Sequence, residues 1–377
     1  MATVTPAPLA DLTTLRLGGP PARYVETATE ADLVAAVRAA DEAGEPLLVL
    51  GGGSNLVVPD EGFPGVVVRD TRRELVVEGD ASTCGGASIR VAAGTPWEDV
   101  VDRAVDEGWV GVEALTGIPG STGATPVQNV GAYGQEVAGV VSTVRVWDRE
   151  QARVRTLAAA ELGFGYRTSV LKRSLREPDG GPSRWAPTPR FVVLDVGFQM
   201  RLGTLSAPIA YPELAGLLDV PVGARAPLVE VRAAVRRLRA RKGMLLDPDD
   251  HDTWSAGSFF TNPVVPVELA DTLPDDAPRY PVRSPVPETT TGPSLGAIDP
   301  GLVKTSAAWL IERAGFGRGY GLPGPVGIST KHTLALTNRG DGTTAELLAL
   351  ARRVRDGVRE RFGVTLEPEP VLVGVSL

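Results

Sequence analysis

The stretch GIPGSTGATPVQNVGAYG (117–134) constrains this chain more than any other, because it holds five glycines and no charged side chain. Glycine reaches backbone angles that other residues avoid, and it lets a ligand approach the main chain closely. Ordering such a stretch costs conformational entropy. We therefore expect a long loop at 117–134 whose ordered state a bound ligand stabilises.

A second glycine loop, GGGSN (51–55), directly follows the buried strand predicted for PLLVL (46–50). Its successive N–H groups suit an anion nest. The pattern is neither a P-loop nor a dinucleotide-binding fingerprint of the G-x-G-x-x-G type. A third run, GFGRGYG (315–321), follows a predicted helix and is interpreted as a turn.

Taken alone, each glycine loop is more often a structural turn than a ligand site. Together, the loops at 51–55 and 117–134 describe an uncharged cradle that can hold a pyrophosphate through N–H groups. Gln128 and Asn129 add amides that donate and accept. This mixture suits a large ligand with a pyrophosphate and a heterocycle, and a flavin dinucleotide fits.

Composition excludes several classes of protein. The chain has 377 residues, enough for two or three domains, and its net charge of −8 argues against general nucleic-acid binding. The single cysteine, Cys84, has no second cysteine with which to form an intramolecular disulfide, and we expect no redox role for it. The two histidines are far apart in sequence, so we expect no metal site. No secretory signal and no membrane-spanning run is recognised, so we expect a cytoplasmic protein without membrane partners.

Periodicity and caps predict a mixture of helices and strands. We expect helices from Thr29 to Gly44, after Pro96, over 227–241, over 304–315, and from Thr343 to Gly363. We expect strands at 46–50, 65–70, 88–94, 140–148, 154–159, 191–202 and 364–377. Segments 173–190 and 264–300 are expected as irregular loops, and the arginines of 227–241 as a solvated face.

Five motifs, in order, carry a resemblance that covers nearly the whole chain: LGGGSNLVV, GIPGSTGATPVQNVGAYG, FGYRTSVLK, AGSFFTNP and LEPEP. They resemble the UDP-N-acetylenolpyruvoylglucosamine reductases, flavoenzymes that make UDP-N-acetylmuramate for peptidoglycan. The resemblance implies an α+β fold: an FAD-binding fold of the vanillyl-alcohol-oxidase type with a third, substrate-binding α+β domain. The implied domains are 1–75 together with a C-terminal strand 366–377, then 76–226, then 227–365.

The resemblance also implies the ligands and the sites. FAD and NADPH are the expected cofactors, UDP-N-acetylglucosamine enolpyruvate is the expected substrate, and a monomer is expected. The residues implied for FAD are Gly51, Gly52, Gly53, Ser54, Asn55, Gly117, Ile118, Pro119, Gly120, Ser121, Gly123, Ala124, Gln128, Asn129, Gly131, Ala132 and Tyr133. Those implied for substrate are Tyr166, Tyr211, Lys242 and Asn262, and for Asn262 a turn-forming Asn-Pro is nearly as good an interpretation.

Three residues match the family's catalytic positions. Arg167 would bind the substrate carboxylate, Ser258 would donate the proton, and Glu369 would act beside Arg167 on the enolate. The chain departs from a common form of the last motif, since Pro370 follows the glutamate and Val371 stands where an arginine is often found.

Two other functions stay open at this point. One is an FAD oxidase of the same fold that acts on an alcohol or a lactone. The other is a sugar-nucleotide binding protein without catalysis, against which the presence of all three catalytic residues counts. For Phe259, Phe260 and Trp309, core positions are favoured over a place in the site.

Overall fold

The computed structural model describes residues 2–4, 7–78, 86–283 and 296–377, so Cys84 lies outside the described residues. The chain forms two compact units. Unit 1 comprises Met1–Pro6, Pro21–Gly52 and Pro64–Leu245, and unit 2 comprises Ala7–Pro20, Gly53–Phe63 and Leu246–Leu377. The domain boundaries expected at 75/76 and 226/227 stay predictions.

A small sheet in unit 1 has the strand order β1 (Ala2–Val4), β2 (Pro21–Thr27), β5 (Phe63–Asp70) and β3 (Leu47–Leu50). Helix α1 (Glu30–Ala43) packs on it through Leu33 and Val37. The Thr29 side chain accepts a hydrogen bond from the Asp32 amide, and Gly44 ends the helix at φ +63°. Both predicted caps are confirmed.

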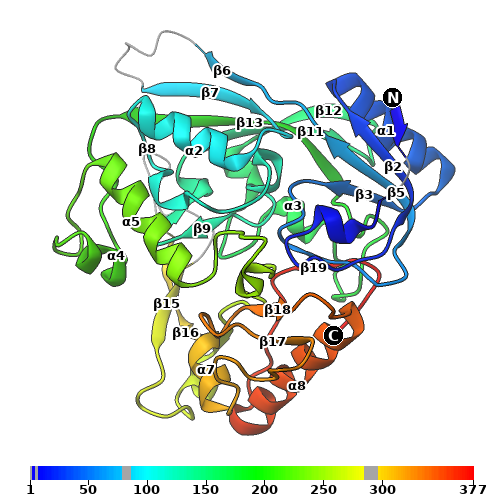
Figure 1. The fold of residues 1–377 in the computed structure, drawn as a ribbon. Coiled ribbons are helices and arrows are strands. Elements are labelled where there is room, and N and C mark those ends of the chain that lie inside the picture. The colour runs from blue at the N-terminus through cyan, green and yellow to red at the C-terminus, as the bar shows by residue number, and fades with distance from the viewer. Residues whose placement is uncertain (1, 5–6, 79–85, 284–295) are drawn as a thin grey trace. The chain divides into compact units, whose positions relative to one another are not determined.

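The larger sheet of unit 1 is antiparallel (Figure 1). Its strands run in the order β12 (Arg153–Ala158), β11 (Val141–Asp148), β13 (Phe191–Leu202), β7 (Ala87–Ala92) and β6 (Leu75–Glu78), with β8 (Trp109–Val110) pairing the end of β13. Helix α2 (Trp97–Asp106) covers one face and buries Trp97, Val100 and Val101 against Ile89 and Phe198. This packing holds the β7–α2 connection, where one glycine loop is anchored.

Unit 1 also contains a short hairpin and further α-helices. They are the hairpin β9 (Gly131–Ala132) and β10 (Gln135–Glu136), and the helices α3 (Val170–Arg173), α4 (Pro212–Leu217) and α5 (Leu228–Arg241). Leu214 and Ala215 of α4 pack with Val231, Val235 and Leu238 of α5 in a separate small core. The two helices lie side by side in Figure 1.

Unit 2 has its own hydrophobic core around α7 (Ala307–Arg313) and α8 (Thr344–Phe362). Its strands form a sheet of order β14 (Val264–Pro266), β16 (Ile298–Thr305) and β15 (Arg279–Arg283), a hairpin of β17 (Val326–Ile328) and β18 (Leu336–Asn338), and a parallel pair of β4 (Leu56–Val57) and β19 (Val371–Leu372). A short helix, α6 (Val267–Ala270), follows β14. The capping box of Thr343 and Glu346 is confirmed, as is the burial of Phe259 and Phe260 in this core.

The expectation of an irregular loop over 264–300 was wrong, because β14, α6, β15 and the start of β16 lie in it. Its prolines obscured the strands. Pro266 and Pro281 lie on the edge strands β14 and β15, where a missing N–H is tolerated. Pro300 lies where the register between β15 and β16 shifts, so it is paired with no residue of β15.

Two predicted elements are shorter than expected. Of the strand predicted over 364–377, only Val371–Leu372 pairs as a strand, and Pro368 and Pro370 before it lack the N–H that a longer ladder needs. Helix α7 begins at Ala307 rather than at 304, because Lys304 and Thr305 belong to β16 and Ser306 caps the helix.

We expect Asp148 on β11 to link stability to pH. Its fully buried carboxylate pairs with Arg190 at 2.8 Å and with Arg155 at 3.1 Å. Burial raises its pKa, but hydrogen bonds from Arg190, Arg155 and the Gln151 amide outweigh this and lower the pKa from 3.8 to about 2. Since the folded-state pKa lies below the unfolded value, the stabilisation is present above that value and is lost as pH falls toward 2.

Asp148→Asn should lower the free energy of unfolding at pH 7 by about 1–2 kcal/mol, with some screening by the solvent that reaches Arg155. Urea denaturation at several pH values measures this, and the difference from the parent should shrink below pH 3. Glu150→Gln is the control, because this more exposed carboxylate also pairs with Arg190. An equal loss in both variants, or a loss independent of pH, would refute the assignment.

Candidate functional site

Arg167 occupies a tight turn between residues 165 and 168. The amides and carbonyls of Gly165 and Thr168 bond to each other in both directions, at 3.1 and 3.3 Å. Arg167 has a left-handed φ of +53°, which is uncommon for a residue with a Cβ. Such backbone strain persists where the surrounding structure enforces it, often at functional positions.

The guanidinium of Arg167 lies against the second half of the glycine stretch. Its Nη2 donates to the Gly131 carbonyl at 2.7 Å, and a Cβ on Gly131 would stand 3.1 Å from Nη1. The ring of Tyr166 lies 5.5 Å from the guanidinium carbon. The structure thus brings Arg167 and Tyr166, which are predicted as catalytic and substrate-binding residues, next to the loop around Gly131 that is predicted to bind FAD.

The two glycine loops also meet inside unit 1. A Cβ on Gly52 would stand 2.5 Å from the Gly120 Cα, and one on Gly51 would stand 2.6 Å from the Ser121 Oγ. Gly120 has a φ of +129°, a conformation that favours glycine. At Gly52 and Gly120, backbone therefore packs on backbone, and the two uncharged loops predicted to bind FAD lie against each other.

Gly52→Ala should disturb this loop contact, because the clash is with backbone atoms that cannot rotate away. We expect a loss of about 1–3 kcal/mol of stability and a lower FAD content after purification. Gly139→Ala is the control, since nothing lies within 4 Å of a Cβ there. Thermal unfolding and flavin absorbance measure both effects, and equal behaviour of the two variants would contradict the prediction.

The loop from Gly117 to Ala124 is anchored to the β7–α2 connection. The Gly120 carbonyl accepts from the Trp97 amide at 3.0 Å, and the Thr122 and Gly123 amides donate to Thr95 and Ala93 at 2.8 and 2.9 Å. Glu98 of α2 accepts from the Gly117 amide. Ile118, Pro119 and Ala124 belong to this same anchored segment.

Asn129 supports the loop from within. It is 1% exposed, its amide donates to Glu136 at 2.8 Å and to the Gly165 carbonyl at 3.1 Å, and its oxygen accepts from the Ala138 amide. Gln128 accepts from Lys172 at 3.5 Å. Asn129 therefore joins the glycine stretch to the Arg167 turn, which gives it a structural role beside the predicted ligand role.

Three of the predicted residues gather at the end of α5. The rings of Tyr133 and Tyr211 meet edge to face at 5.3 Å, and the Lys242 Nζ lies 5.6 and 5.9 Å from their centres. Burial raises the pKa of the Tyr133 phenol and outweighs the opposite effect of Lys242 and Arg239. Lys242 also pairs with Glu213 at 2.6 Å, a residue that the sequence analysis did not single out.

Arg239 is a second residue that the sequence analysis missed. Its Nε lies 3.1 Å from where a Cβ of Gly117 would be, and among the described atoms this Nε is buried with no hydrogen-bond partner. Burial lowers the pKa of its guanidinium, although Tyr133 and Glu98 act against this. The expectation of a solvated arginine face on 227–241 was therefore wrong for Arg239, whose place four residues after buried Val235 was the available signal.

Unit 2 brings Ser258 and Glu369 onto adjoining segments. The Glu369 amide donates to the Phe259 carbonyl at 2.9 Å, and the Thr261 amide donates to the Glu367 carbonyl at 3.0 Å. Asn55 joins the same place, because its amide reaches the Glu369 carbonyl at 3.4 Å and its carbonyl accepts from Val371 at 2.9 Å. Ser258 and Glu369 thus lie on neighbouring segments within one unit, and Val371 keeps its backbone pairing with Asn55.

The remaining predicted residues of unit 2 have backbone roles. The Asn262 oxygen accepts from the Ala307 amide at 3.0 Å and so holds the start of α7. Gly53 has a φ of +63°, and a Cβ there would stand 1.8 Å from the Leu12 carbonyl oxygen. The boundary between the units falls inside the GGGSN loop, between Gly52 and Gly53, with Ser54 and Asn55 on the unit 2 side.

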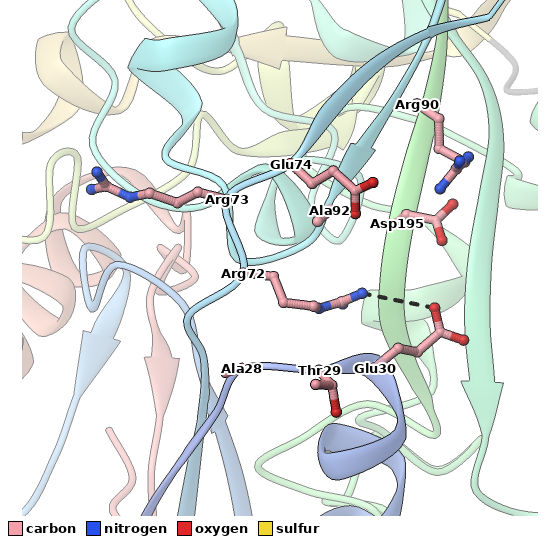
Figure 2. Close-up of a pocket in the computed structure, with 9 residues that line it drawn as sticks. All are labelled: Ala28, Thr29, Glu30, Arg72, Arg73, Glu74, Arg90, Ala92 and Asp195. Carbon is pink, nitrogen blue, oxygen red and sulfur yellow. Dashed lines mark ion pairs between the residues drawn. The ribbon is translucent and has the colours of Figure 1, made fainter.

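A surface pocket of about 510 Å³ lies elsewhere in unit 1, between the start of α1 and the large sheet (Figure 2). Arg72 bonds there to Asp70 at 2.7 Å and pairs with Glu30 at 3.7 Å. Burial raises the pKa of Asp195 despite the nearby Arg145. The lining of this pocket, as far as the structure describes it, shares no residue with the predicted site.

Comparison with known proteins identifies the family. A relative from Thermobifida fusca (strain YX), named UDP-N-acetylenolpyruvoylglucosamine reductase, is 53% identical over 373 residues and covers 98% of both chains. The chain belongs to the UDP-N-acetylenolpyruvoylglucosamine reductase family. The family's C-terminal domain model matches residues 247–373, and an FAD binding domain model matches residues 21–157.

Further relatives agree. The reductase of the same name from Nocardia farcinica (strain IFM 10152) is 53% identical over 98% of this chain and 89% of its own. The crystal structure of UDP-N-acetylenolpyruvylglucosamine reductase from Thermus caldophilus is similar with a TM-score of 0.60 at 26% identity, over 99% of each chain. The resemblance and the α+β, FAD-binding fold expected from the sequence are confirmed.

This chain is therefore an oxidoreductase and an FAD flavoprotein. Within the part of the chain that the structure describes, no helix has the length and apolar character needed to cross a membrane.

Proposed function

We propose that this enzyme reduces UDP-N-acetylglucosamine enolpyruvate to UDP-N-acetylmuramate, with NADPH as the reductant, in the cytoplasmic synthesis of peptidoglycan precursors. The observation that supports this most directly is the 53% identity to a reductase of that name over 98% of both chains. The matching positions of Arg167, Ser258 and Glu369 support the same reaction.

The chemistry divides between the cofactor and the chain. When bound and reduced by NADPH, the flavin would supply the hydride that adds to the enolpyruvyl methylene carbon. Negative charge then develops on the neighbouring carbon and on the carboxylate, where a planar guanidinium binds better than a lysine does. Arg167 is suited to this role because its turn and its bond to the Gly131 carbonyl hold the guanidinium in place before substrate arrives.

Ser258 would give the proton to the carbon next to the methylene, where the negative charge develops. A serine hydroxyl is a weak acid, but an enolate-like carbanion is a strong base, so the transfer is favourable once charge has developed. Glu369 would act with Arg167 on the carboxylate and enolate, and its backbone bond to Phe259 keeps it next to the Ser258 segment.

The remaining predicted residues would bind the substrate. Lys242 is assigned to its diphosphate and Tyr211 to closure over it, and their contact with Tyr133 supports a common place for the two. Tyr166 and Asn262 complete the set. We expect the chain to work as a monomer.

The deciding experiment mixes the purified holoenzyme with NADPH and UDP-N-acetylglucosamine enolpyruvate and follows the loss of the nicotinamide absorbance. Turnover that depends on the enolpyruvyl substrate supports the proposal. Fast consumption of oxygen with no need for this substrate would instead indicate an oxidase of the same fold.

We expect the flavin to be bound without a covalent tether. Many oxidases of this fold attach the flavin through histidine, and both histidines of this chain lie in unit 2, with His251 packed on Trp254 at 4.4 Å. Acid or heat should release all flavin into the supernatant. Yellow colour that stays with the precipitated protein would contradict this.

A further inference from the structure

The Lys242 ammonium is already engaged in the protein as described. Its Nζ pairs with the Glu213 carboxylate at 2.6 Å. Lys242 caps the C-terminus of α5, and Glu213 lies in the first turn of α4, two residues after Tyr211. A ligand anion must therefore compete with the Glu213 carboxylate for Lys242.

We propose that Glu213 is an electrostatic gate on the nucleotide-sugar site: it holds Lys242 in the free enzyme and is displaced by a ligand diphosphate. This inference rests on the proposed function, in which Lys242 binds the diphosphate. It adds a residue that competes with substrate and thereby selects ligands by charge.

Charge and exposure set the strength of this gate. The side chains of Lys242 and Glu213 are 27% and 46% exposed, so water screens their attraction. A diphosphate carries more than one negative charge and attracts the ammonium more strongly than one carboxylate does. Breaking the Lys242–Glu213 pair costs every anion the same free energy, so only an anion that attracts the ammonium more strongly than the carboxylate does, such as a diphosphate, displaces Glu213 readily.

Packing allows Glu213 to leave without unfolding its helix. Helix α4 is held to α5 through Leu214 and Ala215, which are buried, whereas the Glu213 side chain is half-exposed. Rotation of the Glu213 side chain breaks its ion pair with Lys242 and leaves the hydrophobic core between α4 and α5 in place.

The same ion pair keeps the lysine charged. Burial lowers the pKa of Lys242, but the hydrogen bond to Glu213 and the nearby Tyr133 outweigh this and raise the pKa. The site therefore presents a protonated ammonium when the diphosphate arrives.

The test measures the binding of UDP to the holoenzyme by calorimetry at low ionic strength and in 0.5 M salt. Glu213→Gln keeps the shape of the side chain and should bind UDP about two- to five-fold more tightly at low salt. The gain should shrink in high salt, since salt screens exposed charges. Glu213→Asp keeps the charge and should stay closer to the parent.

Two further variants distinguish the gate from a general effect of net charge. Glu230→Gln removes the same charge from the first turn of α5, at the opposite end of that helix from Lys242, and should leave UDP binding unchanged. Lys242→Met should weaken UDP binding and should abolish the gain from Glu213→Gln in the double variant.

Three results would overturn the gate. If Glu213→Gln binds UDP no more tightly while Lys242→Met binds it weakly, Glu213 has no gating role and the proposed function stands. If Glu230→Gln tightens binding equally, the effect is one of net charge alone. If Lys242→Met binds UDP normally, the gate and the assignment of Lys242 fail together, whereas turnover of the enolpyruvyl substrate still tests the reaction.

Discussion

Ser258→Ala should leave the reduction of the flavin by NADPH at its normal rate and should slow the re-oxidation by UDP-N-acetylglucosamine enolpyruvate by several orders of magnitude. A proton donor to the substrate carbon takes no part in the first half-reaction. The expected slowing exceeds the roughly 10²–10⁴ usual for a general acid, because water is excluded from a closed site. Anaerobic stopped flow with each substrate in turn measures the two steps separately.

The controls for this experiment lie on the same segment. Ser255→Ala also loses a hydroxyl, which accepts from the Gly257 amide at 3.2 Å, and it should slow neither half-reaction by more than a few-fold. Ser258→Cys should recover part of the rate, since a thiol is the more acidic group. Equal slowing of both half-reactions in Ser258→Ala would indicate a packing role, and normal re-oxidation would mean that another group supplies the proton.

Arg167→Ala should lose mainly the substrate half-reaction, by about 10²–10³ in rate, which corresponds to about 3–4 kcal/mol for one charge-assisted contact to developing negative charge. Arg167→Ala combined with Glu369→Gln should be far from additive, because both residues would act on one carboxylate and enolate. Single-turnover rates for the two single variants and the double variant give the coupling.

Arg167 also bonds to the Gly131 carbonyl, so the flavin content of each variant is measured alongside its rates. Arg173→Ala, six residues further along the chain at an exposed position, is the control for the loss of a guanidinium. Full additivity of Arg167→Ala and Glu369→Gln would mean that the two residues work separately. Loss of flavin reduction by NADPH in Arg167→Ala would indicate that Arg167 supports the FAD-binding glycine loop rather than the substrate.

Local chemistry explains which elements were predictable. The N-terminal caps of α1 and α8 follow from short polar patterns, Thr29 with Asp32 and Thr343 with Glu346, whose residues interact within one helical turn. The sheet of 264–305 was not predictable in this way, because prolines at edge strands and at a register shift carry the same local signal as a loop.

The candidate site shows the same division. The motifs around Arg167, Ser258 and Glu369 identify these three residues through their resemblance to the family, but the motifs do not predict which contacts hold each residue in position. Arg239 and Glu213 looked like ordinary surface charges, since a charged residue on a helix is usually solvated. Their contacts with Gly117 and Lys242 arise only when α5 packs beside the glycine stretch and α4.

The sequence by itself determined the family, the FAD cofactor and the two uncharged glycine loops, because glycine spacing and neighbouring polar residues are properties of the chain alone. Only the tertiary structure decided that Gly52 packs on Gly120, that Ser258 and Glu369 become neighbours, and that Glu213 reaches Lys242. These are contacts between segments far apart in the chain, and hydrophobic packing of the elements that carry them sets their distances.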